Sequence, residues 1–143
     1  MERKNAWETY DEKQLSALEA VCRRYRAFLD AGKTERECAA ETIRQAKAAG
    51  YRDLDAAIEA GETLKAGDKV YCNVMGKSVL LFIIGREKME KGLNIIGAHI
   101  DSPRLDIKQN PLYEDNEIAY LDTHYYGGIK NYQWVTIPLA LHG

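Results

Sequence analysis

The sequence has few cysteines, no excess of basic residues and no long hydrophobic run, and each of these absences excludes a class of protein. Its three cysteines, Cys22, Cys38 and Cys72, are too few and too widely spaced for a disulfide framework or a C-x-x-C metal site. The formal net charge is −2, so no basic surface is available to attract nucleic acid. We therefore expect reduced thiols, a cytoplasmic location and no nucleic-acid partner.

No segment has the properties of a targeting sequence or a membrane span. The amino terminus, MERKNAWETYDEKQ, is charged where a signal peptide needs an apolar segment. No run approaches the roughly 20 apolar residues that cross a bilayer. The G-x-S-x-G, G-x-x-x-x-G-K-[ST] and G-x-G-x-x-G motifs are also missing, so serine acyl transfer and nucleotide binding have no local support. We expect no membrane partner.

The composition that is present, 45% hydrophobic and 29% charged, is typical of one ordinary globular domain. Apolar residues at three- and four-residue steps predict a first helix that begins near Leu15 and stops at Gly32. Thr34 and Glu37 have the spacing of a capping box at the start of a second helix. A shorter helix is predicted over residues 53–61.

The pattern changes to strand after these helices. KVYCNV and SVLLFIIG flank a turn-like MGK, which predicts a hairpin over residues 69–85. The continuous apolar run before His99 predicts a strand over residues 93–98 that is buried on both faces of a sheet. RLDIKQ, IAYLDTHYYGG and QWVTIPLALHG are further predicted β segments, and NPLYEDNE is a predicted loop. The expected fold class is α/β, with helices first and then a mixed sheet.

His99 and Asp101 stand directly after the predicted strand, in NIIGAHIDSPRLDIKQNP. Functional groups in open α/β sheets gather beyond the carboxyl ends of the strands. Imidazole is a common zinc ligand, and a carboxylate two residues further along an extended backbone projects to the same side, where it can accept the other ring N–H. Pro103 lacks an amide proton and helps to turn the chain out of the sheet. A metal site at this point is chemically reasonable.

A structural alternative is open for the same two residues. His99 can bond a backbone carbonyl, and Asp101 can cap a turn through Ser102; because H-x-D is a short pattern, the residues alone favour this reading. A metal site needs three or more protein ligands. Neither His124 nor His142 has acidic neighbours that complete one, so we interpret both as packing residues.

NIIGAHIDSPRLDIK, with YYGGIKNYQW downstream and LLFIIG upstream, closely resembles the amino-terminal part of the M18 metalloaminopeptidases, the aspartyl aminopeptidase group. The resemblance covers most of the chain from Lys69 onward. It implies that residues 1–108 form the amino-terminal part of a zinc-peptidase-like α/β/α catalytic domain. Residues 109–143 would be the incomplete start of an inserted β-rich dimerisation domain. It also implies a homo-oligomer, a dodecamer in that family.

The function implied by the resemblance is hydrolysis of the amino-terminal residue from peptide substrates. The family uses two divalent metal ions, with zinc as the expected metal, and a metal-bridged hydroxide. His99 is implied as a metal ligand, and Asp101 as the catalytic-site carboxylate that supports this ligand. The other ligands and a catalytic glutamate are implied to lie further along a much longer chain, so we expect an inactive fragment. Its substrate-binding residues are unknown from sequence.

Some positions depart from the family pattern. Ile100 stands where many members have threonine, and IKNYQWVTIPL replaces a stretch that resembles D-R-D-L in other members. The resemblance therefore does not extend to the preferred amino-terminal residue, and the family's preference for acidic residues is not carried over to this chain. Tyr126, Gly127 and Gly128 match the family's Tyr- and Gly-rich motif, and the glycines suit a sharp bend because they tolerate positive φ.

Two other functions stay open. The chain could be a non-catalytic assembly or binding module that uses its β edges and its tyrosine-rich segment 113–132. It could also be a mononuclear zinc hydrolase of another fold, which would need two more ligands from this chain. The chain stops after an apolar run and is predicted to be interrupted; a reading frame that continues past Gly143 with acidic ligands and a late histidine would favour the aminopeptidase.

Overall fold

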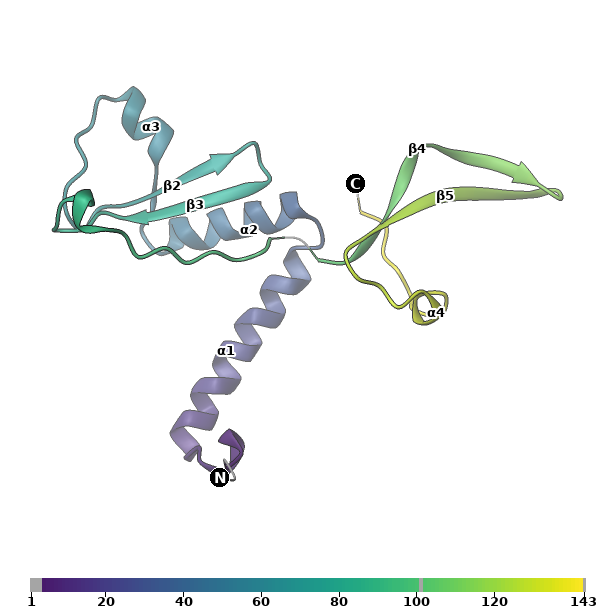
Figure 1. The fold of residues 1–143 in the computed structure, drawn as a ribbon, viewed down its shortest axis with the longest axis horizontal. Coiled ribbons are helices and arrows are strands. Elements are labelled where there is room, and N and C mark those ends of the chain that lie inside the picture. Colours follow the sequence, from purple (N-terminus) through teal and green to yellow (C-terminus); the bar gives the residue numbers. More distant parts are fainter. Residues whose placement is uncertain (1–3, 101, 143) are drawn as a thin grey trace. The chain divides into compact units, whose positions relative to one another are not determined.

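The computed structural model describes residues 4–100 and 102–142, and the chain divides after Asn94 into two units (Figure 1). The first unit contains η1 (Ala6–Glu8), α1 (Glu12–Ala31), α2 (Glu35–Ala48), β1 (Arg52–Asp53), α3 (Leu54–Glu59), β2 (Lys69–Val74), β3 (Ser78–Ile83) and η2 (Met89–Lys91). The second unit contains β4 (Arg104–Asp115), β5 (Ile118–Tyr126) and α4 (Asn131–Trp134). Helices followed by strands confirm the predicted α/β class in this coarse form.

Local capping explains where the first helices begin and end. The Gly32 amide donates to the carbonyl of Phe28 over 3.0 Å at the end of α1, as the sequence predicts. At the start of α2, the Glu37 amide donates to Thr34 Oγ1 over 3.3 Å, and the Thr34 amide donates to Glu37 Oε2 over 2.9 Å. The predicted capping box is confirmed, and it satisfies amide groups that have no partner within the helix.

Removal of this cap should destabilise α2. Thr34→Ala is expected to lower the free energy of unfolding by about 1 kcal/mol, because the Glu37 amide loses its acceptor. Denaturant unfolding followed by circular dichroism measures the change. Thr34→Ser keeps the hydroxyl and is the matched control; an equal loss in both variants would contradict the capping explanation.

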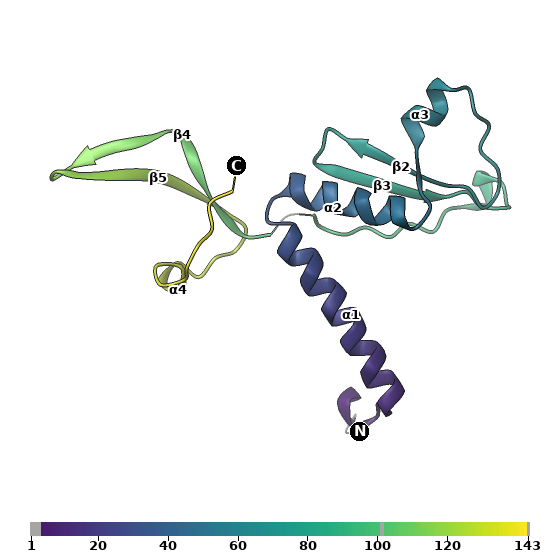
Figure 2. The ribbon, with the colours of Figure 1, turned by 180° about the vertical axis from the view of Figure 1, so that it is seen from behind.

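The sheet of the first unit is mixed and three-stranded, in the order β1-β2-β3. β1 pairs parallel with β2, and β2 pairs antiparallel with β3, which confirms the predicted hairpin. Figures 1 and 2 show α2 alongside β2 and β3. The buried hydrophobic residues lie on α2, α3 and β2: Cys38, Ala39, Ala46, Ala57, Val70 and Tyr71. Small side chains on α2 allow the helix to approach the sheet closely.

The carboxyl group of Glu41 has a strongly lowered pKa. Arg44 Nε and Nη2 donate to its carboxylate over 2.6 and 2.7 Å, and Gln45 Nε2 donates over 2.8 Å. The hydrogen bond from Arg44, followed by that from Gln45, lowers the pKa of Glu41 to about 2. Both donors favour the ionised form.

The lowered pKa predicts a pH-dependent contribution to stability. A carboxylate with a depressed folded-state pKa stabilises the fold above its ordinary pKa, and this contribution is lost as the pH falls toward the folded value, about 2. Glu41→Gln should therefore unfold at lower temperature than the parent near neutral pH, and the two should converge as the pH approaches about 2. Melting temperatures measured across this range test it; a constant difference would contradict it.

The second unit is organised by the long β4–β5 hairpin. Asn116 and Glu117 form its two-residue turn, with φ of 52° and 64°, as a type I′ turn requires. The predicted loop over residues 110–117 is therefore wrong except at this turn, because β4 continues to Asp115. The turn-forming residues Asn110 and Pro111 lie instead inside β4, where the pairing register with β5 shifts between Ile107 and Leu112.

Two predicted strands are absent from the described chain. Residues 93–98 pair with no strand, and Ile95 and Ile96 are 84% and 97% exposed. Residues 133–142 contribute to α4 and then to irregular backbone. A strand needs neighbours that pair its amides and cover its apolar side chains, and no described element does so here.

The predicted domain boundary between residues 108 and 109 falls inside β4 and stays a prediction. The described helices include none with the length and apolar composition of a membrane span.

Candidate functional site

His99 lies in the irregular segment that leads into β4. The residue is exposed. Asp101, the second predicted site residue, lies outside the described residues. The geometry of the H-x-D pair is therefore not part of the structure, and the metal-ligand prediction for His99 and the supporting role of Asp101 stay predictions.

Arg104 is the first residue of β4 and is held on two sides. Its Nε donates to Asp106 Oδ1 over 2.7 Å, and its Nη2 donates to Asp106 Oδ2 over 3.2 Å. Its guanidinium carbon also lies 4.9 Å from the centre of the Tyr126 ring, within the range of a cation–π contact. The register explains both contacts, because Arg104 is the cross-strand partner of Tyr126 and Asp106 follows on the same face.

Gly127 follows β5 and packs against the residue that precedes β4. Its φ is 74°, a conformation that glycine adopts without strain. A Cβ at this position would lie 3.2 Å from both Cα and Cγ of Pro103. The expected positive φ is therefore found at Gly127, whereas the neighbouring Gly128 is not among the glycines with positive φ.

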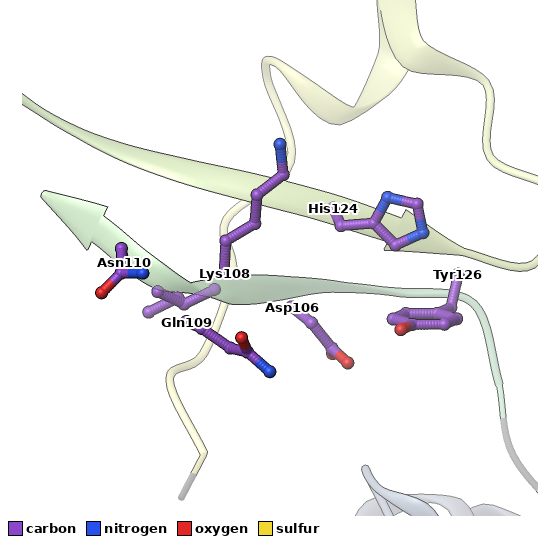
Figure 3. A pocket seen from close by; sticks show the side chains of 7 residues that line it. Asp106, Lys108, Gln109, Asn110, His124 and Tyr126 are labelled. Carbon is purple, nitrogen blue, oxygen red and sulfur yellow. The ribbon is translucent and has the colours of Figure 1, made fainter. Parts of the chain in front are cut away.

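A shallow pocket of 520 Å³ lies along the hairpin beyond this point. Its lining residues are Asp106, Ile107, Lys108, Gln109, Asn110, His124 and Tyr126, and Figure 3 shows them along β4 and β5. The pocket coincides with the register shift, where residues 108–111 of β4 face only Asp122 of β5. Lys108 Nζ lies 2.9 Å from Asp122 Oδ2, so this part of the bulge is occupied by an exposed ion pair.

Among the described residues, no three His, Cys, Asp or Glu side chains gather in an arrangement that could hold a metal ion. His124 lies among aromatic rings, with ring centres 5.8 Å from Tyr125 and 4.8 Å from Tyr126. His124 is nevertheless exposed, and its interpretation as a packing residue stays a prediction. His142 is exposed near the end of the chain.

Comparison with known proteins identifies the family. A family model described as "Aminopeptidase I zinc metalloprotease (M18)" matches residues 28–143. This match covers more than half of the chain and includes the H-x-D segment. The chain belongs to the M18 family. The resemblance noted in the sequence is thereby confirmed.

Relatives and solved structures agree with this M18 membership. A probable M18 family aminopeptidase 1 of Clostridium acetobutylicum is 58% identical over 142 residues, which are 99% of this chain and 30% of that protein. The crystal structure of aminopeptidase I from Borrelia burgdorferi B31 matches with a TM-score of 0.83 and 38% identity, over 94% of this chain and 32% of that one. Aminopeptidase I from Clostridium acetobutylicum matches with a TM-score of 0.75 and 56% identity, over 96% and 30%.

The M18 chain described here thus spans about 30% of the length of the curated relatives that it matches. A zinc site uses three or more protein ligands, and the described residues bring together no such set.

Sequence reasoning missed the contacts at the start of this hairpin. Arg104 and Asp106 have the i, i+2 spacing that places two strand residues on one face, and this signal could have suggested their pairing. No comparable signal places Tyr126 opposite Arg104, because the irregular register cannot be read from the sequence.

Proposed function

We propose that this chain forms the amino-terminal part of a metal-dependent aminopeptidase that removes the amino-terminal residue from peptides. The observation that carries the proposal is the family match over residues 28–143, which includes His99. The family is described as zinc metalloproteases, and zinc in proteins is bound by side chains such as imidazole and carboxylate. The exposed His99 can supply one of these ligands.

The chemistry of the donors allows one metal ligand from this chain. His99 is exposed, and neutral imidazole is a good ligand for zinc and similar ions. We propose two divalent ions, zinc in the simplest case, which when bound supply the Lewis acid that activates water and polarises the peptide carbonyl. The remaining ligands and the general base would come from outside the described residues.

Within this scheme the two predicted site residues have different tasks. His99 presents one ring nitrogen to the cation. Asp101 accepts the N–H of the other ring nitrogen, which fixes the tautomer and raises the basicity of the coordinating nitrogen. The H-x-D spacing supports this assignment, because alternate residues of an extended segment project to the same side.

We also propose that two segments of the chain belong to different domains. Residues 1–108 would belong to the catalytic domain and residues 109–143 to an inserted β-rich domain that mediates homo-oligomer formation, up to a dodecamer. Exposed aromatic residues on the hairpin support an assembly role. Tyr113 and Tyr120 stack with ring centres 5.2 Å apart and are 52% and 37% exposed, and tyrosine is enriched at protein interfaces.

The test uses the polypeptide of full family length that contains this chain. It is assayed with peptides that carry a free amino terminus and with the same peptides acetylated at that end, while bound metal is quantified. We expect metal-dependent hydrolysis of the free peptides only, and none by the 143-residue chain alone. Equal hydrolysis of the acetylated peptides would overturn the aminopeptidase assignment. An inactive protein that still forms defined oligomers would favour the assembly-module alternative.

A further inference from the structure

The H-x-D segment is followed at once by a set of contacts that closes the hairpin at its open end. Residues 92–100 belong to no helix or strand. The first regular backbone after His99 is β4, which begins at Arg104. Contacts that hold Pro103 and Arg104 therefore determine where the polypeptide enters β4.

The first contact is steric. A Cβ at Gly127 would approach Cα and Cγ of Pro103 to 3.2 Å and its Cβ to 3.4 Å. The two 3.2 Å distances are shorter than most real Cβ contacts, and the proline ring has no flexible end that can move aside. Glycine at residue 127 is what permits the end of β5 to lie directly against Pro103.

The second contact is electrostatic. Two donors of Arg104 engage the Asp106 carboxylate, and the same guanidinium lies 4.9 Å from the centre of the Tyr126 ring. The Arg104 side chain is 21% exposed. A planar guanidinium held by a two-point hydrogen bond and by an aromatic face has little freedom to rotate.

We propose that Arg104 and Gly127 are positioning residues for the metal centre. Together with Pro103 and Tyr126 they form a clamp that holds the backbone at residues 103–104, at the start of β4. His99 is five residues before Arg104, so a shift of the clamp moves the backbone that carries the ligand. Displacement of a catalytic group by about 1 Å can cost on the order of 100-fold in rate.

This inference rests on the proposed function, and it makes a prediction that a purely structural role does not. In the full-length enzyme, Arg104→Met and Gly127→Ala should weaken metal binding by about 10- to 100-fold, as the loss of groups that orient a ligand does. The turnover number should fall while KM for a short peptide stays close to the parent value, because neither residue is assigned to substrate.

Metal affinity is measured by competition with a chelator, and Co²⁺-substituted enzyme gives an absorption spectrum that reports the ligand geometry. Arg44→Met is the matched control for arginine, since Arg44 forms a similar two-point bond with Glu41 in α2. Gly92→Ala is the control for glycine, since Gly92 has a φ of 105° and open space around its Cα. Both controls should retain the parent metal affinity and spectrum.

The outcomes separate the clamp from the proposed function. A parent enzyme without metal-dependent hydrolysis removes the proposed function. A parent that is active, with Arg104→Met and Gly127→Ala indistinguishable from the two controls in metal affinity and spectrum, overturns the clamp alone. If Gly127→Ala does not fold, Arg104→Lys decides, because it keeps the positive charge but not the planar fork: parent-like metal affinity would overturn the clamp.

Discussion

His99→Ala in the full-length enzyme is expected to abolish peptide hydrolysis and to weaken binding at one metal position. Alanine offers no donor atom, so the ion that we propose for this imidazole would lose one of its few protein ligands. Because His99 is exposed, the variant is expected to keep the fold. Turnover and metal content measured on the same preparation give the result.

His142→Ala is the matched control, because His142 is a second exposed histidine for which we propose no role in metal binding. It should retain the metal content and turnover of the parent. Normal values of both quantities in His99→Ala would remove His99 from the metal site. The structural alternative, a histidine bonded to backbone, would then be the remaining explanation of the motif.

Asp101→Asn is expected to keep the fold and to lose activity, or to lose roughly 10- to 100-fold in metal affinity. The amide keeps the size of the carboxylate but removes its charge, so in the proposed site the ring N–H of His99 would lose its ionised acceptor. The nitrogen proposed to bind the metal would become less basic and its tautomer less restricted. Chelator competition and steady-state kinetics at saturating metal separate the loss of affinity from the loss of rate.

Asp30→Asn controls for the removal of one negative charge. Its side chain is 84% exposed and forms a long ion pair with Lys33, 3.7 Å from Nζ to Oδ1, so parent-like kinetics are expected. Asp101→Asn with unchanged kinetics and unchanged metal affinity would leave only the interpretation of Asp101 as a turn-capping residue.

The parts of the fold that depend on neighbouring residues were predictable from the sequence. The capping box of Thr34 and Glu37 and the end of α1 at Gly32 are formed within one helical turn, so their signals lie in adjacent letters. The β2–β3 hairpin is also local, because three residues connect its strands. In these cases the groups that need hydrogen bonds and the groups that satisfy them are close in the chain.

The errors share another physical origin. The apolar run over residues 93–98 has the composition of a buried strand, yet Ile96 is 97% exposed and unpaired in any ladder. Strand formation depends on packing and pairing with residues far away in the sequence. The composition of the segment therefore shows that it is compatible with a buried strand, but not that neighbouring strands are present to pair with it. The opposite error occurred at Pro111, where turn-forming letters mark a register shift inside β4 rather than a loop.

The H-x-D segment and the motif around Tyr126 identify the family from the sequence, and local signals give the helix ends and the first hairpin. The residues that meet at the open end of the second hairpin are known only from the folded chain. Pro103 and Gly127 touch across 24 positions of sequence, and Arg104 faces Tyr126 across the strands. Such contacts depend on the pairing register of β4 and β5 and on the path of the backbone between them. Neither can be read from a short stretch of sequence.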